Sequence, residues 1–400
     1  MSKTPKLFVM FAVMVVSGLA SAVAQEAKSP TVYTVVNDEN TPDSNGHFNS
    51  GSVYVNGAYS ARIVTGSYGI DGGGYLGNHS VDIAVINPQM QCVFIADAGG
   101  VSGNGPGDVY AYNVATKSGT RTMSGLGYNG NLYGIALEHW GNTLIVGWAG
   151  SGALETFTIG ANCALTSSGS SASGMGLNLG TVDEFAIAPN GLFVAATYED
   201  GSYGVYPLNG TTISAPAQYN SNCSNPPYYA VPVGIAISPD SSAVYLDCLY
   251  GENGALIDAF TVSNAGVTVT NGPINAAGGT PVNGSVTMGL SPDGTVLYIV
   301  GTFSGAIEST NVNGTSVTPN SCSNFVPPGY NSEWIYPGTI DVLGSGAGQG
   351  LAIPQTAFDT TPDSYLELLR IDAKHCLSAV TQGVDANSMY ALSGASYVKQ

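Results

Sequence analysis

The sequence predicts an all-β fold made of short antiparallel strands, and three observations support this prediction. The chain has 54 Gly and 21 Pro in 400 residues, so turns are frequent. Only 9% of the residues are charged and 44% are hydrophobic, which is enough to bury a full core and argues against intrinsic disorder. Short runs of β-branched and aromatic residues recur between the turns, as they do in strands.

The chain opens with a segment that is typical of a signal peptide. Lys3 and Lys6 precede an apolar run over residues 7–16, and small residues follow as far as Ala24. The run is shorter than the roughly 20 residues that a membrane-spanning helix needs, and no later segment is long enough. We therefore expect residues 1–24 to be removed and residues 25–400 to form one secreted or periplasmic domain without a membrane span.

The charge balance excludes one class of partner. Nine Lys and Arg residues stand against 27 Asp and Glu residues, which gives a net charge of −18. A protein that binds nucleic acid neutralises phosphates with clustered basic side chains, and this chain has too few of them. We therefore expect no nucleic-acid partner.

An internal repeat indicates how the exported domain is organised. Five apolar segments end in similar turns about 50 residues apart; they are residues 81–88, 133–139, 183–189, 233–239 and 286–292. A second β-branched or aromatic run follows each of them, and a third run opens with a small residue. Further copies of the third run begin at Gly51 and Ser364, and a weaker fourth run completes the unit. Four short strands in about 50 residues, repeated seven times, predict a seven-bladed β-propeller with four-stranded antiparallel blades.

The two ends of the chain are expected to meet in one blade. Residues 31–36 match a second strand, so the first blade lacks its innermost strand. The segment from Ser388 to Gly394 follows the last full repeat and can supply that strand, which would remove an open sheet edge. An open array or two small sandwiches are the alternative architecture.

Two repeats carry motifs of a known family. The segments Gly-Ile-Ala-Ile-Ser-Pro-Asp240 and Gly-Leu-Ser-Pro-Asp-Gly294 resemble those of secreted bacterial YVTN-type propellers and of the related lactonase-like seven-bladed propellers. The resemblance spans nearly the whole mature chain and implies the propeller fold, whereas the Ser-Pro-Asp motif itself serves a tight turn. The family implies Arg and His residues that hold anionic substrates. At the inner-strand position where it commonly carries His, this chain has Asp82, Tyr133, Asp183, Val233 and Val286.

Carboxylate and aromatic residues gather at one end of the predicted channel, on the inner strands and in the connections after the second strands. We predict a ligand-binding site at this channel mouth, formed by His79, Asp82, Asp97, Tyr133, Asp183, Glu184 and Glu199. Such carboxylates could bind Ca²⁺ or share protons for acid–base chemistry, or they could be separately solvated, as in any acidic protein. We expect that no cofactor is required. His139 and Trp140 are expected in a turn between two strands, with a structural role.

The six cysteines favour disulfides over a zinc site, because none of them is in C-x-x-C spacing. Connections in a propeller alternate between its two faces, which assigns most cysteines to a face. Cys223 and Cys248 fall on one face in neighbouring segments, and Cys92 and Cys163 fall on the other face in adjacent blades. We predict these two pairs as disulfides.

Two classes of function remain open. The first is an exported, non-catalytic binding or scaffold protein that takes a small molecule, a glycan or a protein on its acidic loop face. The alternative is a lactonase-like hydrolase that acts on a ring ester at the channel mouth. A phosphosugar substrate is disfavoured, because the negative surface would repel a dianion. The fold alone does not choose between them.

Overall fold

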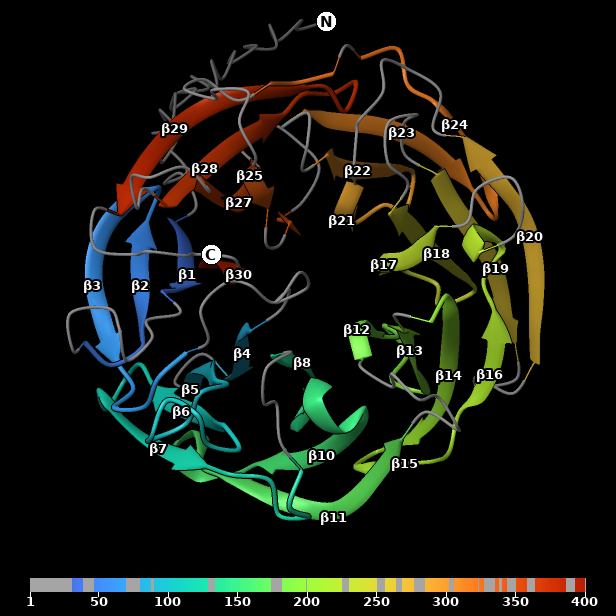
Figure 1. The fold of residues 1–400 in the computed structure, drawn as a ribbon. Coiled ribbons are helices and arrows are strands. Elements are labelled where there is room, and N and C mark those ends of the chain that lie inside the picture. The colour runs from blue at the N-terminus through green and yellow to red at the C-terminus, as the bar shows by residue number, and fades with distance from the viewer. Residues whose placement is uncertain are drawn as a thin grey trace, which may run out of the picture.

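The computed structural model describes most of the chain beyond residue 30. In the described residues the strands form seven antiparallel sheets, which surround a common axis as blades (Figure 1). The predicted all-β propeller is therefore confirmed. The described residues are 31–38, 47–69, 80–87, 90–128, 134–173, 182–198, 200–224, 230–249, 256–263, 268–276, 285–301, 306–322, 324–326, 335–337, 340–343, 350–357, 364–385 and 393–399.

Within each blade the strands follow one another from the axis outward. The innermost strands, from blade one to blade seven, are β30 (Ser393–Lys399), β4 (Val81–Asn87), β8 (Ile135–Trp140), β12 (Val182–Ile187), β17 (Val231–Ile237), β21 (Ser285–Leu290) and the divided β25 (Ile335–Pro337) and β26 (Asp341–Val342). The second strands are β1 (Thr31–Asn37), β5 (Met90–Asp97), β9 (Thr143–Trp148), β13 (Phe193–Tyr198), β18 (Ala243–Leu249), β22 (Val296–Gly301) and β27 (Gly350–Ala357).

The outer half of each blade is built in the same order. The third strands are β2 (Ser50–Val55), β6 (Asp108–Asn113), β10 (Ala153–Ile159), β14 (Ser202–Asn209), β19 (Leu256–Ser263), β23 (Ile307–Asn313) and β28 (Ser364–Ile371). The outer strands are β3 (Ala58–Val64), β7 (Ser118–Thr122), β11 (Leu165–Ser173), the divided β15 (Thr212–Ile213) and β16 (Ala217–Asn220), β20 (Thr268–Ala276), β24 (Ser316–Pro319) and β29 (Leu377–Asp385). The helical elements of the described residues are short 3₁₀ segments, η1 (Ala149–Ser151), η2 (Ala161–Cys163) and η3 (Asn222–Ser224).

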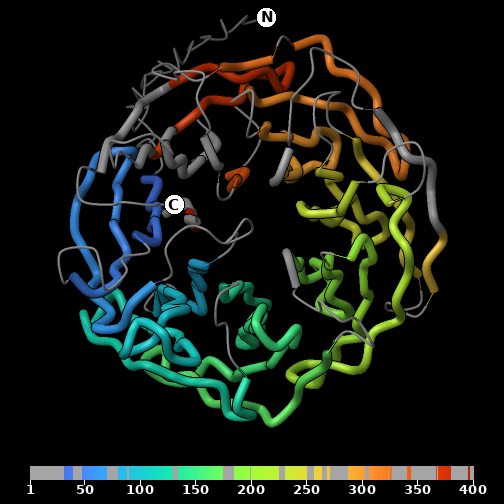
Figure 2. The backbone as a smooth tube through the Cα atoms, viewed as in Figure 1, coloured from blue at the N-terminus to red at the C-terminus, as the bar shows by residue number. Residues whose placement is uncertain are grey.

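The first and the last described strands meet in blade one, where Figure 2 shows a blue and a red segment side by side. β30 pairs antiparallel with β1, with Lys399 opposite Thr31 and Ser393 opposite Asn37. The predicted closing segment is confirmed at Ser393 and Gly394, because the described pairing runs from Ser393 to Lys399, whereas residues 388–392 lie outside the described residues. β30 is rich in small and polar residues, so its sequence pattern is weak. Its place depends on the open edge of β1 that it covers.

The hydrophobic core lies between neighbouring blades. All residues of β9 and β13 are buried, because each second strand is covered on both faces, whereas the outer strand β7 is mostly exposed. Phe94 of blade two packs with Leu144 and Trp148 of blade three. The blades come close enough to require glycine: a Cβ atom on Gly147 would lie 2.9 Å from the ring of Phe185 in blade four.

The Ser-Pro-Asp motifs form turns between the first two strands. In blade five, Ser238 Oγ donates to Asp240 Oδ1 (2.6 Å) and accepts from the backbone N–H groups of Ser242 (3.1 Å) and Ala243 (2.8 Å). In blade six, Ser291 Oγ makes the same bond to its own aspartate at 2.6 Å. The motif therefore holds the turn together through its side chains.

Three disulfides join the described cysteines. Cys92 pairs with Cys163 and Cys223 pairs with Cys248, with Cα–Cα distances of 5.5 Å in both, so both predicted pairs are confirmed. The remaining pair is Cys322–Cys376, which links the region after β24 to the outer turn of blade seven.

The predicted signal peptide, residues 1–24, lies outside the described residues and stays a prediction. Within the part of the chain that the structure describes, no helix has both the length and the apolar character needed to cross a bilayer.

Candidate functional site

The structure describes part of the predicted channel-mouth set. Side chains are described for three of its members, which are Asp82, Asp97 and Glu184. Asp183 is described only through its backbone in β12. The other members lie outside the described residues: His79, Tyr133 and Glu199.

Asp82 lies on the inner strand β4 and forms an ion pair with His139 of blade three. The His139 Nδ1 to Asp82 Oδ2 distance is 2.7 Å, and the two side chains are 27% and 14% exposed. Burial alone would lower the pKa of His139, but Asp82 and the neighbouring Glu138 raise it above its ordinary value. Asp82 therefore favours the protonated form of His139 on the inner strands of the propeller, and the imidazole is partly exposed to solvent.

This pair corrects the expectation for His139 and Trp140. Both residues belong to the end of β8 rather than to the following turn, because the strand runs to Trp140. His139 turns to Asp82 of the preceding blade, whereas Trp140 is 40% exposed and its Nε1 donates to Pro189 O at 3.0 Å. The ion pair was not predicted from the sequence, because its two members are 57 residues apart. The one available signal was that both lie on inner strands of adjacent blades.

Glu138 and Glu184 line a cavity on the inner strands of blades three to six. The cavity has a volume of about 260 Å³. Its walls are mostly apolar and include Phe185, Ile235 and Met288, which are buried. Glu138 Oε2 accepts a hydrogen bond from the backbone N–H of Ile187 at 2.7 Å, so this carboxylate is fixed toward blade four. Successive side chains of a strand point to opposite faces, so Glu138 and His139 act on different sides of β8.

Asp97 lies away from the cavity, in the junction between blades one and two. It is fully buried at the end of β5, and its Oδ1 accepts hydrogen bonds from Asn49 Nδ2 (2.7 Å) and Thr65 Oγ1 (2.9 Å) of blade one. Burial, and then the nearby charge of Asp108, raise the pKa of Asp97 well above its ordinary value. The environment of Asp97 is thus separate from those of Asp82 and Glu184.

The described carboxylates do not gather into a metal centre. Among the residues that the structure describes, no three His, Cys, Asp or Glu side chains come together as a cation site. The Ca²⁺ hypothesis also involves Asp183 and Glu199, whose side chains are not described, so it stays a prediction.

Several buried carboxylates hold neighbouring blades together. Glu155 of β10 accepts hydrogen bonds from Ser124 Oγ (2.6 Å) and from the backbone N–H of Gly125 (3.0 Å), which belong to the connection from blade two. Asp258 of β19 accepts from the backbone N–H of Asn222 (2.7 Å) and from its Nδ2 (2.9 Å) in the connection from blade four. These acidic residues have a structural role.

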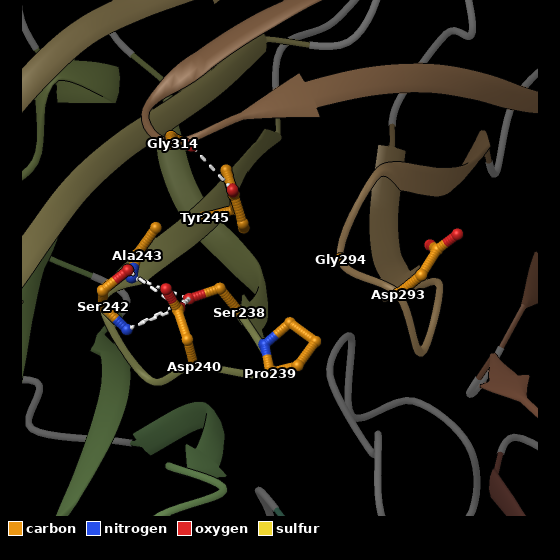
Figure 3. Close-up of a pocket in the computed structure, with 9 residues that line it drawn as sticks. All are labelled: Ser238, Pro239, Asp240, Ser242, Ala243, Tyr245, Asp293, Gly294 and Gly314. Atoms are coloured by element: carbon orange, nitrogen blue, oxygen red, sulfur yellow. Dashed lines mark hydrogen bonds between the residues drawn. The ribbon is translucent and has the colours of Figure 1, made fainter.

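A second cavity, of about 250 Å³, lies between the turns of blades five and six (Figure 3). Asp240 and Asp293 line it together with Tyr245, whose hydroxyl donates to Gly314 O at 2.7 Å. Hydrogen bonds from Ser238 and Ser242 lower the pKa of Asp240, which is therefore ionised. Those bonds belong to the turn itself, and Figure 3 shows the Asp240 carboxylate directed toward both serines.

Comparisons with known proteins show the fold and leave the family open. No family model matches the chain, and no curated protein matches it significantly. Many solved structures match. A candidate 6-phosphogluconolactonase of Bacteroides fragilis is 14% identical, with 94% of this chain and 99% of that chain covered and a TM-score of 0.58. A protein of Lactobacillus plantarum is 12% identical, with 93% and 100% covered and a TM-score of 0.63.

A further solved structure that resembles this chain is that of a periplasmic protein. The periplasmic gluconolactonase of Pseudomonas aeruginosa is 14% identical, with 77% of this chain and 81% of that chain covered and a TM-score of 0.51. At such identities the likeness shows a propeller of the lactonase-like shape. The resemblance to YVTN-type repeats stays a prediction. Three disulfides are compatible with an oxidising compartment.

Proposed function

We propose that the protein is an exported propeller that binds a small molecule without converting it, and that the cavity on the inner strands is its binding site. The observation that carries this proposal is the cavity of about 260 Å³ with apolar walls and two carboxylates, Glu138 and Glu184. Ligand pockets are typically apolar with a few placed polar groups, and drug-sized ligands need about 300 to 1,000 Å³. The cavity therefore suits a molecule with one ring.

The charge of the lining selects among such molecules. None of the described residues that line the cavity is a Lys, an Arg or a His. The chain as a whole carries a net charge of −18. An anion would be repelled by both, whereas a cationic nitrogen would be attracted to the carboxylates and a neutral ring would still gain the apolar contact.

Three compounds with the same ring test this proposal: cyclohexylamine, cyclohexanol and cyclohexanecarboxylate, each titrated by calorimetry and by NMR. We expect the amine to bind best, the alcohol less well and the carboxylate least. Ala186→Leu places extra carbon in the cavity and should weaken all binding, whereas Ala164→Leu on the exposed outer turn of blade three should not. Equal binding of the acid and the amine, or binding unaffected by Ala186→Leu, would contradict the proposal.

A second candidate function is lactonase-like hydrolysis of a neutral ring ester. The His139–Asp82 ion pair favours it, because a carboxylate on Nδ1 leaves Nε2 to exchange a proton with a substrate or a water molecule. The Bacteroides fragilis structure is described as a candidate 6-phosphogluconolactonase and the Pseudomonas aeruginosa structure as a gluconolactonase. Their likeness to this chain supports the candidate function at the level of the fold.

Hydrolysis of δ-valerolactone, followed by acid release, separates the two functions. If the protein is a hydrolase, His139→Gln should lower the rate by about 10² to 10⁴, the usual contribution of general acid–base catalysis. Asp82→Asn should change the pH profile of that rate, because it removes the charge beside His139. If the wild type hydrolyses the lactone no faster than buffer does, the hydrolase function is excluded for this substrate and the binding function is the one that stands.

A further inference from the structure

Two buried carboxylates face one another across a hairpin of blade two. Asp97 ends β5 and Asp108 begins β6, and the strand register places them directly opposite each other. Their exposed fractions are 0% and 3%. Asp97 Oδ1 is occupied by the blade-one donors Asn49 and Thr65, and Asp108 Oδ2 accepts from Ser67 Oγ of blade one at 2.8 Å.

Among the described residues, the second oxygen of each carboxylate has no such donor. Apart from one another, Asp97 Oδ2 and Asp108 Oδ1 have no hydrogen-bond partner among the described residues, and both atoms are buried. Two adjacent carboxylates in a buried site cannot both be ionised without a large electrostatic penalty. A single proton removes this penalty, because one carboxyl O–H can then donate to the other carboxylate.

The charged and titratable groups around the pair indicate where the proton lies. Arg121 of β7 reaches the pair through Ser67, with its Nη1 donating to Ser67 Oγ at 3.1 Å, and it favours the ionised form of Asp108. Burial raises the pKa of Tyr110 on β6, and the nearby Tyr112 and Asp97 add to this effect. The described blade-one residues that bond to the pair are Asn49, Thr65 and Ser67, and all three are uncharged. The proton therefore belongs on Asp97, with Asp108 as its acceptor.

We propose that Asp97 and Asp108 share one proton and form a pH-sensitive clasp between blade one and blade two. With the proton present, Asp97 donates to Asp108 while both accept hydrogen bonds from blade one. At higher pH the proton leaves to solvent, two carboxylates face each other, and the clasp opens.

The direction of the pH effect follows from the folded environment of Asp97. Burial and Asp108 raise its pKa above the value in the unfolded chain, so the proton contributes stability at low pH. That contribution is lost as the pH rises through the raised pKa of the folded protein. At pH values below that raised pKa the junction therefore stays closed.

The clasp supports backbone contacts on the adjoining loops. Tyr68 N–H donates to Gly100 O and Gly99 N–H donates to Tyr68 O, both at 2.9 Å, which joins the connection after β3 to the connection after β5. Thr65 N–H donates to Asn49 O at 3.0 Å. Opening of the carboxyl pair should release these amides before the rest of the ring.

Asp97→Asn is the variant that imitates the protonated state. The amide oxygen can keep the bonds from Asn49 and Thr65, and the amide N–H₂ can donate to Asp108 Oδ1 at any pH. Amide hydrogen exchange at Tyr68, Gly99 and Thr65, corrected for intrinsic exchange and measured between about pH 5 and pH 9, spans the range above the ordinary carboxyl pKa. In the wild type we expect local opening to increase by up to about tenfold per pH unit above the pKa of the pair, which is the slope for one proton. In Asp97→Asn the extent of local opening should not change with pH.

Asp258→Asn is the matched control. The oxygens of Asp258 are occupied by donors from Ser221 and Asn222, so an amide there loses a hydrogen bond and should destabilise blade five while leaving the pH response of the clasp intact. Asp108→Asn is a second test, because its amide can donate to Asp97 Oδ2. Parallel pH profiles in the wild type and in either clasp variant would overturn the proposal. Protection restored at high pH by added CaCl₂, but not by NaCl of equal ionic strength, would also overturn it, because the pair would then be a cation site.

Discussion

Removing the Cys92–Cys163 disulfide should destabilise the protein more than removing Cys223–Cys248. The first bond closes a loop of 71 residues and joins β5 of blade two to η2 in blade three, whereas the second closes a loop of 25 residues. In the chain-entropy treatment these loops correspond to about 4.4 and about 3.5 kcal/mol of stability. Either value is a large part of the free energy of unfolding of a folded protein, which is usually about 5 to 15 kcal/mol.

The comparison uses the double variants Cys92→Ala with Cys163→Ala and Cys223→Ala with Cys248→Ala. All four cysteines are fully buried, so the cavities left by the sulfur atoms are similar and largely cancel in the difference. The expected difference is about 0.9 kcal/mol, from the logarithm of the two loop lengths. Unfolding entropy of about 2.1 cal/mol/K per residue converts the larger loss into a fall of roughly 5 °C in Tm.

Urea unfolding of the oxidised proteins, followed by tryptophan fluorescence, to which the buried Trp148 contributes, provides the measurement. Reversed order of the two variants, or two variants as stable as the wild type, would refute the loop-length reasoning. The wild type under reducing conditions is the reference, because all of its described disulfides are then absent and no side chain has been shortened.

Three further predictions concern closure, packing and cations. Deletion of β30 (Ser393–Lys399) should expose the edge of β1 and broaden the thermal transition, and an unchanged melting curve would contradict the role of this strand. Gly191→Ala should lower Tm by several degrees, because the new Cβ would lie 2.3 Å from the ring of Trp140 and the backbone φ there is +68°; Gly210→Ala, also at positive φ but in open space, is the control that isolates the clash. Added Ca²⁺ should raise Tm more than NaCl of equal ionic strength if Asp183 and its neighbours form a cation site, and Asp183→Asn should reduce the response. Identical Ca²⁺ and NaCl curves would remove that hypothesis.

Much of the fold could be predicted because a repeated unit marks its own strands. Periodic apolar runs and the Ser-Pro-Asp turns located the strands of the blades, and the alternation of faces then paired Cys92 with Cys163. The closing strand was harder to place. β30 consists largely of small and polar residues, and what fixes its register is the vacant edge of β1, which is a tertiary feature.

The site was predictable only in part, because its contacts lie between blades. The position of Asp82 on an inner strand follows from the repeat, but its pairing with His139 depends on how the inner strands of two neighbouring blades pack together. Asp97 was expected at the channel mouth, since it follows a second strand. Its burial comes from Asn49 and Thr65 of blade one, and no pattern within blade two indicates that cover.

The β1–β30 pairing has a consequence for how the protein is made. Synthesis proceeds from the N-terminus, so β1 exists long before its inner neighbour does, and the pairing of Thr34 with Ser396 spans 362 positions of the chain. Contacts of such long range form slowly, because a large loop must close before any stabilising contact is gained. Until the last residues have been released, an emerging chain can fold blade by blade but cannot complete the circle. An incomplete chain would present the bare edge of β1 to its neighbours, so premature termination near the C-terminus should lead to aggregation rather than to a smaller stable protein.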